Sequence, residues 1–283
     1  MLVIGAVLPA AATTARRKKH ILVVTVTKGF RHDSIPVAEQ TIQELGEQTG
    51  LWDTDFVRTD AEMQQKMTRD ALRHYDAVIF ANTTGVLPLP DPQGFLDYIH
   101  EGHGFAAMHS GSDTFHQWPG QTDGVSAYIQ MLGGEFQEHH NQSAIDIHID
   151  DPNNPATRAI AEAARQTVPA GEMATGDATQ HSIAGNSMWR VFDEIYLLKN
   201  SSRSDVHVLL SINHWPPDGS PNANSPGDHL IAWVKPYGKG RVFYTVLGHR
   251  QEVWRDPLYQ KLITGGIEFV LGIGHGSMQL NNH

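Results

Sequence analysis

The sequence contains no cysteine among its 283 residues. Disulfides, thiolate metal sites and thiol nucleophiles are therefore excluded, and His, Asp and Glu are left as the strong metal ligands. Basic residues are also scarce, with 21 Lys and Arg against 31 Asp and Glu and a formal net charge of −10. Because binding to a phosphate backbone needs a basic surface, we expect no nucleic-acid partner. No apolar stretch reaches the length of a membrane-spanning helix, so we expect no membrane span.

The first 19 residues are interpreted as a leader before the folded part. Residues 2–9 are apolar and residues 10–15 are small, an order that resembles a secretory signal without its basic start. The alternative is a disordered extension. A signal predicts export to the periplasm or the extracellular space, whereas a disordered extension predicts a cytoplasmic protein. The remaining chain has no internal repeat and no clear linker, so we expect a single domain over 20–272 and a tail over 273–283.

Short apolar runs alternate with helical patterns in the first half of the chain. Strands are expected at His20–Thr27, Trp52–Arg58, Asp76–Ala81 and Gly104–Met108, with helices at Ile35–Thr49 and Gln93–Glu101. Strands separated by helices at this spacing indicate an α/β fold with a flavodoxin-like, mostly parallel sheet flanked by helices.

The second half of the chain predicts additional β strands and a terminal helix. The expected strands are Ser143–Asp150, Trp189–Tyr196, Val206–Asn213, His229–Val234 and Gly240–Leu247. The helix is expected over Trp254–Leu271, with Gly265 and Gly266 allowing close packing. Residues 161–187 are polar, rich in Gly and Ala and weakly periodic, so we interpret them as a loop insertion or lid.

The apolar run Gly104–Met108 ends abruptly in the small and polar residues His109–Asp113. This pattern is typical of a strand that meets a tight turn, and in nucleophile elbows such a turn lifts one side chain off the strand end. Here the raised side chain is that of His109. His32 and Asn82 also lie just past predicted strand ends. Because ligands bind outside the carboxyl ends of parallel strands, we expect these residues to meet at one edge of the sheet.

Four of the 17 histidines are candidates for a divalent metal site: His32, His109, His139 and His140. Neutral imidazole is the natural ligand of zinc when thiolates are missing, so zinc is the favoured metal. His139 and His140 are adjacent, and adjacent side chains in a strand point to opposite faces, so one of them is expected to face the site. The alternative is that all four are loop histidines hydrogen-bonded to the backbone.

Three further residues are candidates for catalysis. His249 ends the last predicted core strand, where an imidazole can act as a base near neutral pH, as a ligand or as a structural hydrogen-bond partner. Glu194 can supply a carboxylate, since the neighbouring Asp193 would face the other way in a strand. Asp113 is expected either to orient His109 by accepting its second ring N–H or to cap the following helix.

Candidates for substrate binding are polar or aromatic residues near the predicted loops: Arg31, Asn82, Ser110, Trp118, Asp228 and His229. Arg31 alternatively pairs with Asp33, and Asp228 and His229 alternatively stabilise a turn. Trp118 offers an apolar face for a sugar ring. Ser110 is a weaker candidate for a nucleophile, because no Ser-His-Asp order is evident.

Eight stretches of the chain carry a family resemblance through their order and number. They are Thr27–Ser34, Met108–Phe115, Leu132–Phe136, His139–His140, Asp151–Thr157, Asp193–Tyr196, Asp228–Trp233 and Gly240–His249. Together they resemble the ThuA-like (trehalose-utilisation) family of the class I glutamine amidotransferase-like superfamily, over about residues 20–272. Segment 161–187 is longer than the family's usual connector and loop 213–226 is irregular, and both departures bear on the shape of a substrate pocket.

The resemblance implies a flavodoxin-like fold with extra β structure and a role in carbohydrate metabolism, with activity on keto-sugars or keto-glycosides. A glutamine amidotransferase is excluded, because its cysteine nucleophile is missing. We therefore expect a metal-assisted hydrolase or lyase that cleaves or modifies a keto-sugar or keto-glycoside, with a small-molecule carbohydrate as its partner. Homo-oligomerisation is left open. The alternatives are a non-catalytic sugar-binding or accessory protein and a serine hydrolase that uses Ser110.

Overall fold

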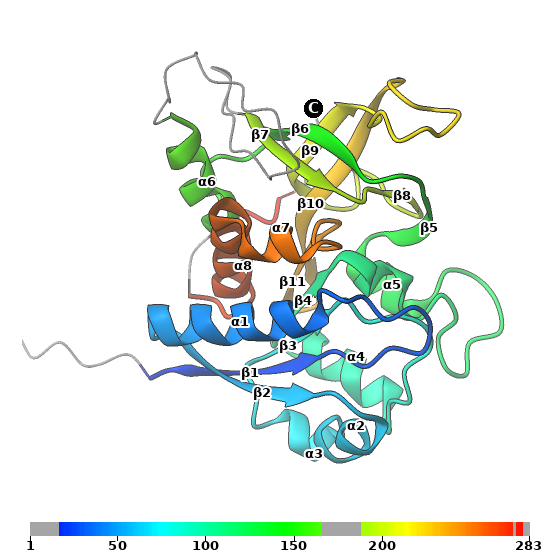
Figure 1. The fold of residues 1–283 in the computed structure, drawn as a ribbon. Coiled ribbons are helices and arrows are strands. Elements are labelled where there is room, and N and C mark those ends of the chain that lie inside the picture. Colours follow the sequence, from blue (N-terminus) through cyan, green and yellow to red (C-terminus); the bar gives the residue numbers. More distant parts are fainter. Residues whose placement is uncertain (1–16, 166–187, 274–275, 280–283) are drawn as a thin grey trace, which may run out of the picture.

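The centre of the fold is a nine-stranded sheet (Figure 1). The computed structural model describes residues 17–165, 188–273 and 276–279. Neighbouring parallel strands make up one half of the sheet: β2 (Trp52–Val57), β1 (Lys19–Val24), β3 (Ala77–Ala81), β4 (Gly104–Met108) and β11 (Gly240–Thr245). Their spatial order β2-β1-β3-β4-β11 is the flavodoxin-like order 2-1-3-4-5, with β11 in the fifth place. The predicted fold class is therefore confirmed.

Antiparallel strands extend the sheet beyond β11, in the order β10 (Pro226–Tyr237), β9 (His207–His214), β6 (Ser143–Ile149) and β7 (Met188–Asp193). A separate ribbon pairs β5 (Glu135–His139) with β8 (Tyr196–Lys199). The hairpin between β10 and β11 turns at Gly238, whose φ of +59° suits glycine. The additional strands predicted for the second half of the chain are therefore present.

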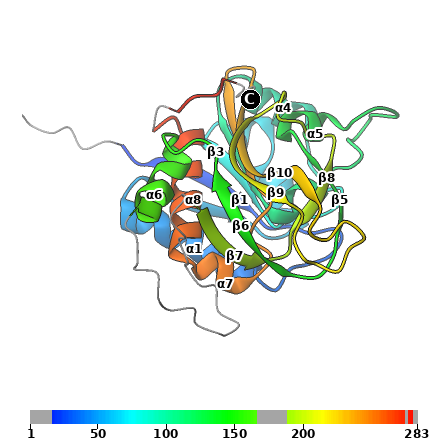
Figure 2. The same ribbon diagram turned by 90° about the horizontal axis from the view of Figure 1, so that it is seen from above.

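Helices cover both faces of the parallel half, because β3 and β4 are apolar along their whole length and must be buried on both sides. Figure 2 shows α1 (Ile35–Thr49), α6 (Pro155–Arg165) and α8 (Pro257–Val270) on one side, and α4 (Pro92–His100) and α5 (Ala127–Leu132) on the other. Shorter helices connect these elements: α2 (Asp60–Lys66), α3 (Arg69–Leu72), the 3-10 helix η1 (His109–Asp113) and α7 (Gln251–Arg255).

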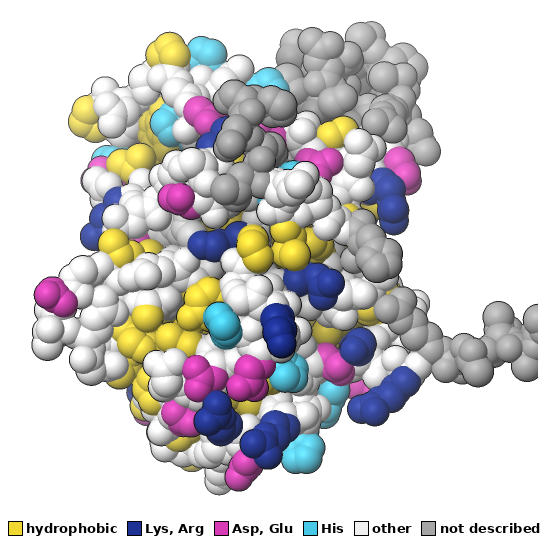
Figure 3. All heavy atoms as spheres, turned by 180° about the vertical axis from the view of Figure 1, so that it is seen from behind, with side chains coloured by type: hydrophobic (Ala, Val, Ile, Leu, Met, Phe, Trp, Pro, Cys, Tyr) yellow, Lys and Arg dark blue, Asp and Glu magenta, His cyan; other side chains and the backbone are white. Residues whose placement is uncertain are grey.

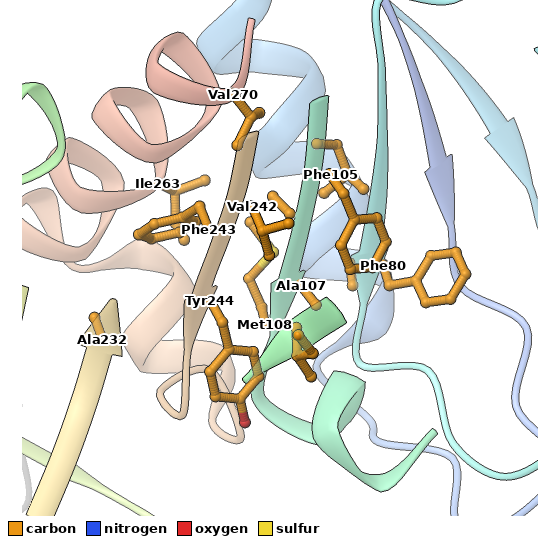
Figure 4. Packing of buried hydrophobic residues seen from close by; sticks show 14 of the residues in the cluster. Phe80, Phe105, Ala107, Met108, Ala232, Val242, Phe243, Tyr244, Ile263 and Val270 are labelled. Carbon is orange, nitrogen blue, oxygen red and sulfur yellow. The ribbon is translucent and has the colours of Figure 1, made fainter. Parts of the chain in front are cut away.

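The largest apolar side chains pack between the central strands and these helices (Figure 4). The ring of Phe80 on β3 lies 5.1 Å from that of Phe105 on β4, measured between centroids. On the other face, α8 approaches β11 so closely that a Cβ on Gly266 would lie 2.5 Å from the ring of Phe243. The predicted role of the Gly265–Gly266 pair in close packing is confirmed, and it offsets the cost of about 1 kcal/mol that glycine has in a helix.

The clearest differences from the predicted elements lie in the second half of the chain. The terminal segment is two helices, because Pro257 lacks an N–H and Asp256 caps α8 by accepting from Leu258 N at 2.7 Å. The segment Trp189–Tyr196 is divided into β7 and β8 after Asp193. Helix α6 was not predicted; its first turn is held by Asn154, whose side chain accepts from Ala156 N at 3.2 Å.

Parts of the predicted leader and of the predicted lid, residues 1–16 and 166–187, lie outside the described residues. None of the helices in the described ranges is long and apolar enough to cross a membrane. On the face shown in Figure 3, acidic and basic side chains lie side by side over the lower part of the molecule, in agreement with the modest net charge.

Candidate metal centre

The candidate site lies where polar loops follow the carboxyl ends of the parallel strands. His32 lies between β1 and α1, His109 begins η1 directly after β4, and His249 lies on the loop after β11. Glu194 follows β7 and so comes from the antiparallel half of the sheet. The convergence of histidines predicted from the strand ends is observed.

His109 stands at a sharp turn, as its sequence pattern predicts. Its φ is +48°, in the left-handed region that residues with a Cβ seldom adopt. Tyr244 on β11 fixes this turn, since its hydroxyl donates to the backbone carbonyl of His109 at 2.7 Å. The same hydroxyl lies 2.8 Å from Ser112 Oγ. His109 is fully buried, and the turn fixes the point from which its imidazole projects.

Four side chains, which we call the four-residue cluster, bring their ligand atoms within 4.8 Å of one another: His32, His109, Glu194 and His249. His109 Nε2 lies 3.2 Å from His32 Nε2, 3.3 Å from His249 Nδ1 and 3.6 Å from Glu194 Oε2. Glu194 Oε2 lies 3.1 Å from His249 Nδ1. These atoms surround one point at the edge of the sheet.

Two histidines of the cluster use their second ring nitrogen elsewhere. His109 Nδ1 lies 2.9 Å from the carbonyl of Val246, which can only accept, so Nδ1 carries the proton and Nε2 keeps a lone pair. His32 Nδ1 lies 3.4 Å from Ser110 Oγ. A carbonyl on the second nitrogen is the usual way of orienting a metal-binding histidine. The facing Nε2 atoms of His109 and His32 therefore need a proton or a metal cation between them.

The electrostatics favour the metal-binding forms of His32 and Glu194, whereas the pKa of His249, which burial lowers, is raised by the hydrogen bond and charge of Glu194. Burial, followed by the nearby His109 and His249, lowers the pKa of His32 to about 3, so His32 is neutral at pH 7. Burial alone would raise the pKa of Glu194, but the nearby His109 and His249 outweigh it and hold that pKa well below its usual range. Neutral imidazole and ionised carboxylate are the metal-binding forms of these side chains.

The spacing of these atoms fits a small divalent cation. Zinc binds nitrogen and oxygen at about 2.0–2.2 Å in a tetrahedron, which separates neighbouring ligand atoms by about 3.3–3.6 Å. Four of the six distances among the four ligand atoms run from 3.1 to 3.6 Å, and all six are within 4.8 Å. Imidazoles with a carboxylate suit zinc and other first-row metals. The assignment of zinc stays a prediction.

Asp193 fixes the loop that carries His249. Its buried carboxylate accepts the backbone N–H of Gly248 at 2.7 Å and that of Arg250 at 3.2 Å, on either side of His249. Asn82, a predicted substrate-binding residue, is also buried and donates from Nδ2 to the Gly248 carbonyl at 2.9 Å. Both side chains therefore fix the backbone of the loop that carries His249.

His139 lies beside the cluster, whereas His140 does not. His139 Nδ1 is 3.0 Å from Glu194 Oε1, the oxygen that the cluster leaves unused. His140 Nε2 is instead 3.9 Å from Glu138 Oε2. The side chain of His139 is 45% exposed and that of Glu194 only 8%, so His139 connects the buried carboxylate to solvent. One histidine of the pair faces the site, as predicted, but neither belongs to the four-residue cluster.

Asp113 contacts a different histidine from the one that was expected. Its Oδ1 accepts from His116 Nε2 at 2.7 Å, and His116 Nδ1 lies 2.7 Å from Glu135 Oε1. We call Asp113, His116 and Glu135 the His116 bridge. The expected contact of Asp113 with His109 is wrong, because the imidazole of His109 points to Val246 after β11 whereas Asp113 closes η1.

Ser110 is fully buried beside His32. In a Ser-His-acid relay, the second nitrogen of the histidine faces a carboxylate. Here the second nitrogen of His32 faces His109. The geometry therefore suits Ser110 as a group that orients His32 rather than as a nucleophile.

Two other predicted substrate-binding residues have partners within the protein. Arg31 Nη1 donates to the carbonyl of Thr25 at 2.9 Å, and not to Asp33. Trp118 is only 6% exposed, with its ring centroid 4.9 Å from that of Phe115. Its ring belongs to the core and offers no free face to a sugar.

Asp228 and His229 line a separate cavity of about 220 Å³. The carboxylate of Asp228 accepts two hydrogen bonds from Arg203, at 2.6 and 2.7 Å. Tyr196 lines the same cavity, and its ring centroid lies 4.2 Å from that of His109. The cavity is therefore separated from the four-residue cluster by one aromatic side chain.

The fold and the site together define a flavodoxin-like α/β protein with a histidine–carboxylate cluster at the carboxyl edge of its parallel strands. The family model for trehalose utilisation, ThuA, matches residues 20–270. This chain therefore belongs to the ThuA family. Among curated proteins the comparison gives no match.

Solved structures share the fold at low sequence identity. A ThuA-like protein from Bacteroides uniformis ATCC 8492 is 20% identical, with a TM-score of 0.62 over 93% of this chain and 95% of that one. A ThuA-like protein from Parabacteroides merdae ATCC 43184 is 16% identical, with a TM-score of 0.65 over 90% of each chain. A β-galactosidase from Rahnella sp. R3 is 10% identical, with a TM-score of 0.51 over 92% of this chain and 32% of that one. These likenesses are evidence of fold alone.

Proposed function

We propose that this protein is an enzyme that uses a divalent metal to cleave or modify a carbohydrate bearing a carbonyl group, a keto-sugar or keto-glycoside. Membership of the trehalose-utilisation family supports the proposal that the substrate is a carbohydrate. The proposal of a metal rests on the facing ring nitrogens of His32 and His109, which lie 3.2 Å apart. The other ring nitrogen of His109, Nδ1, is hydrogen-bonded to a carbonyl.

In this proposal His32, His109 and His249 hold the metal. Three protein ligands and one open position are typical of catalytic zinc, whereas four protein ligands are typical of structural zinc. When bound, the metal would supply a Lewis acid that polarises the substrate carbonyl. A polarised carbonyl makes the neighbouring C–H bond more acidic.

Glu194 and His139 form the pair that moves the proton. The ionised Glu194 holds His139 Nδ1 at 3.0 Å, so His139 Nε2 is the nitrogen available to substrate on the more exposed side. A carboxylate that orients an imidazole in this way supports general base catalysis near neutral pH. His139 thus accepts a proton, and Glu194 stabilises the imidazolium that forms.

On a keto-glycoside the reaction is an elimination. The proton leaves the carbon between the carbonyl and the glycosidic carbon, its electron pair forms a C=C bond, and the glycosidic C–O bond breaks as the leaving oxygen takes up a proton. Release of the unsaturated sugar defines a lyase, and addition of water across the C=C bond makes the net reaction a hydrolysis. Neither course needs an oxidant or the two opposed carboxylates of ordinary glycosidases. Asp193, the neighbouring carboxylate, is already bonded to backbone N–H groups.

The test combines metal analysis with turnover in protein purified without a His tag. Metal content is measured by mass spectrometry, and a 3-keto-glycoside is assayed before chelation, after chelation and after zinc is restored. His109→Gln is compared with His74→Gln, because His74 is an exposed histidine at the end of α3 and serves as a matched control.

For the wild type, the proposal predicts about one metal per chain, loss of turnover on chelation and recovery of turnover with zinc. His109→Gln is expected to contain no metal, and His74→Gln is expected to behave like the wild type. Full activity after chelation would remove the metal from the mechanism. Metal-free protein that binds sugar without turnover would indicate a sugar-binding or accessory protein instead.

A further inference from the structure

We propose that Phe30 is the platform on which the ring of the bound sugar stacks beside the metal centre. This inference rests on the proposed function for the identity of the ligand. Phe30 and Val86 are the exposed large hydrophobic residues in the described part of the chain, at 67% and 50% exposure. Burial of a phenylalanine is worth about tenfold to a hundredfold in an equilibrium constant, so folding gains nothing from leaving this ring in solvent.

The exposed ring stands directly beside the four-residue cluster. Its centroid lies 4.8 Å from that of His32, and the two ring planes meet at 83°. His32 in turn faces His109 across 3.2 Å. The exposed ring of Phe30 is therefore separated from His109 by one side chain, that of His32.

The backbone of Phe30 is held rigidly by a neighbouring loop. The hydroxyl of Thr84 donates to the Phe30 carbonyl at 2.9 Å and accepts from the N–H of Gly29 at 3.1 Å. One residue earlier, Lys28 N donates to the Thr84 carbonyl at 2.8 Å. An aromatic side chain on a clamped backbone loses little further freedom when a ligand binds, which favours a recognition role.

The close approach of the two loops also depends on glycine. Gly85 has a φ of +74°, and a Cβ there would lie 2.9 Å from Lys28 Cβ. The exposed Val86 follows directly on the same loop. The two exposed apolar side chains are therefore carried by loops that are joined to each other, after β1 and after β3.

The chemistry of this surface matches a sugar ring better than an open chain. A pyranose places several C–H groups on one face while its oxygens point outward from the rim. The C–H face packs on an aromatic ring, and the rim oxygens remain available to the cluster. Pockets that bind small molecules combine apolar walls with a few convergent polar groups in the same manner.

The test measures binding and turnover of a cyclic keto-glycoside and of its parent glycoside in metal-loaded wild type, Phe30→Ala and Phe30→Tyr. Binding is measured by calorimetry, and metal content and melting temperature are recorded for each variant. We expect Phe30→Ala to weaken ring binding by about tenfold or more, with the loss in KM rather than in kcat. Phe30→Tyr, which keeps the ring, is expected to recover most of the binding.

The outcomes separate this inference from the proposed function. Wild type that binds the ring without turnover, together with Phe30→Ala that loses binding, supports the platform while the catalytic proposal fails. Turnover by wild type with unchanged KM in Phe30→Ala overturns the platform and leaves the catalytic proposal standing. Wild type that binds neither sugar overturns both. If Phe30→Ala has a much lower melting temperature than wild type, Phe30→Leu is used in its place. This variant keeps apolar bulk without an aromatic face, so the proposal requires that it also weakens ring binding.

Discussion

The four-residue cluster and the His116 bridge each join imidazole to carboxylate, at opposite ends of η1, and they differ in what the ring nitrogens contact. In the bridge, both nitrogens of His116 lie 2.7 Å from a carboxylate oxygen. In the cluster, His109 has a carbonyl on one nitrogen and a second imidazole on the other.

This difference decides where the positive charge resides. An imidazole between two carboxylates donates from both nitrogens and is itself the cation, so the hydrogen bond with Asp113, and that with Glu135, raise the pKa of His116 although burial opposes them. An imidazole whose lone pair faces other nitrogens needs a proton from one of them or a metal cation. Histidine beside carboxylate therefore indicates a metal only when the tautomer leaves a nitrogen lone pair directed into the site.

The strongest test of this comparison removes one imidazole from the four-residue cluster and, separately, one from the His116 bridge. We expect His109→Gln to lose the metal and to lower turnover by about a thousandfold or more, because a Lewis acid supplies several kcal/mol of transition-state stabilisation. His116→Gln is expected to keep one metal per chain. Metal content by mass spectrometry and steady-state kinetics measure both effects, and equal metal loss in the two variants would contradict the distinction drawn between them.

The sequence predicts those members of the cluster whose positions are set by the ends of parallel strands. His32, His109 and His249 follow β1, β4 and β11, and parallel strands direct their carboxyl ends to one edge. Glu194 arrives from β7, in the antiparallel half, where a period of two indicates which side a residue faces but not what lies opposite.

Other features leave no mark in the sequence. The carbonyl that orients His109 belongs to Val246, and any residue there would provide one. Orientation of His109 was one of two roles expected for Asp113, and its observed partner His116 can be identified only once the path of the chain after η1 is known. The missed start of α6 did have a signal, since Asn154 followed by Pro155 is a common helix start.

The next largest effect is expected from Asp193→Asn, which changes the support of His249 without touching the ligand atoms. Both oxygens of Asp193 accept backbone N–H groups, and an amide would present a donor to one of them. We expect metal affinity to fall by about 10–100-fold, as for other groups that orient ligands, and unfolding free energy to fall by about 1.5–3 kcal/mol. Metal titration and denaturant unfolding measure the two; lost stability with unchanged metal affinity would make Asp193 purely structural.

A smaller effect is expected from Ser110→Ala. Ser110 Oγ contacts His32 Nδ1 at 3.4 Å, a long hydrogen bond that is worth little. Metal affinity is expected to fall by about tenfold at most, with turnover retained at saturating metal. Abolished turnover with normal metal content would restore the serine-hydrolase alternative, since a nucleophile is indispensable where an orienting hydroxyl is not.

The smallest effect concerns the His116 bridge and depends on pH. Because the pKa of His116 is raised, its contribution to stability is complete below the ordinary histidine pKa of about 6.5 and is lost as the pH rises through the raised value. Burial would raise the pKa of Glu135, but hydrogen bonds with His116 and Asn200 hold it lowered, so that carboxylate contributes above about pH 4.5 and is lost as the pH falls through its lowered pKa. The bridge is therefore complete between about pH 4.5 and 6.5.

His116→Gln should accordingly destabilise the protein most near pH 6, by about 0.5–1 kcal/mol, a range reduced for solvent screening because the His116 side chain is 38% exposed. The difference from wild type should shrink as the pH rises towards 9, through the raised pKa of His116. Denaturant unfolding of both proteins at pH 6 and pH 9 measures it, with His74→Gln as the exposed control. A destabilisation that is equal at the two pH values would mean that His116 acts through packing. The conclusion that His116 is itself the cation of the bridge would then be wrong.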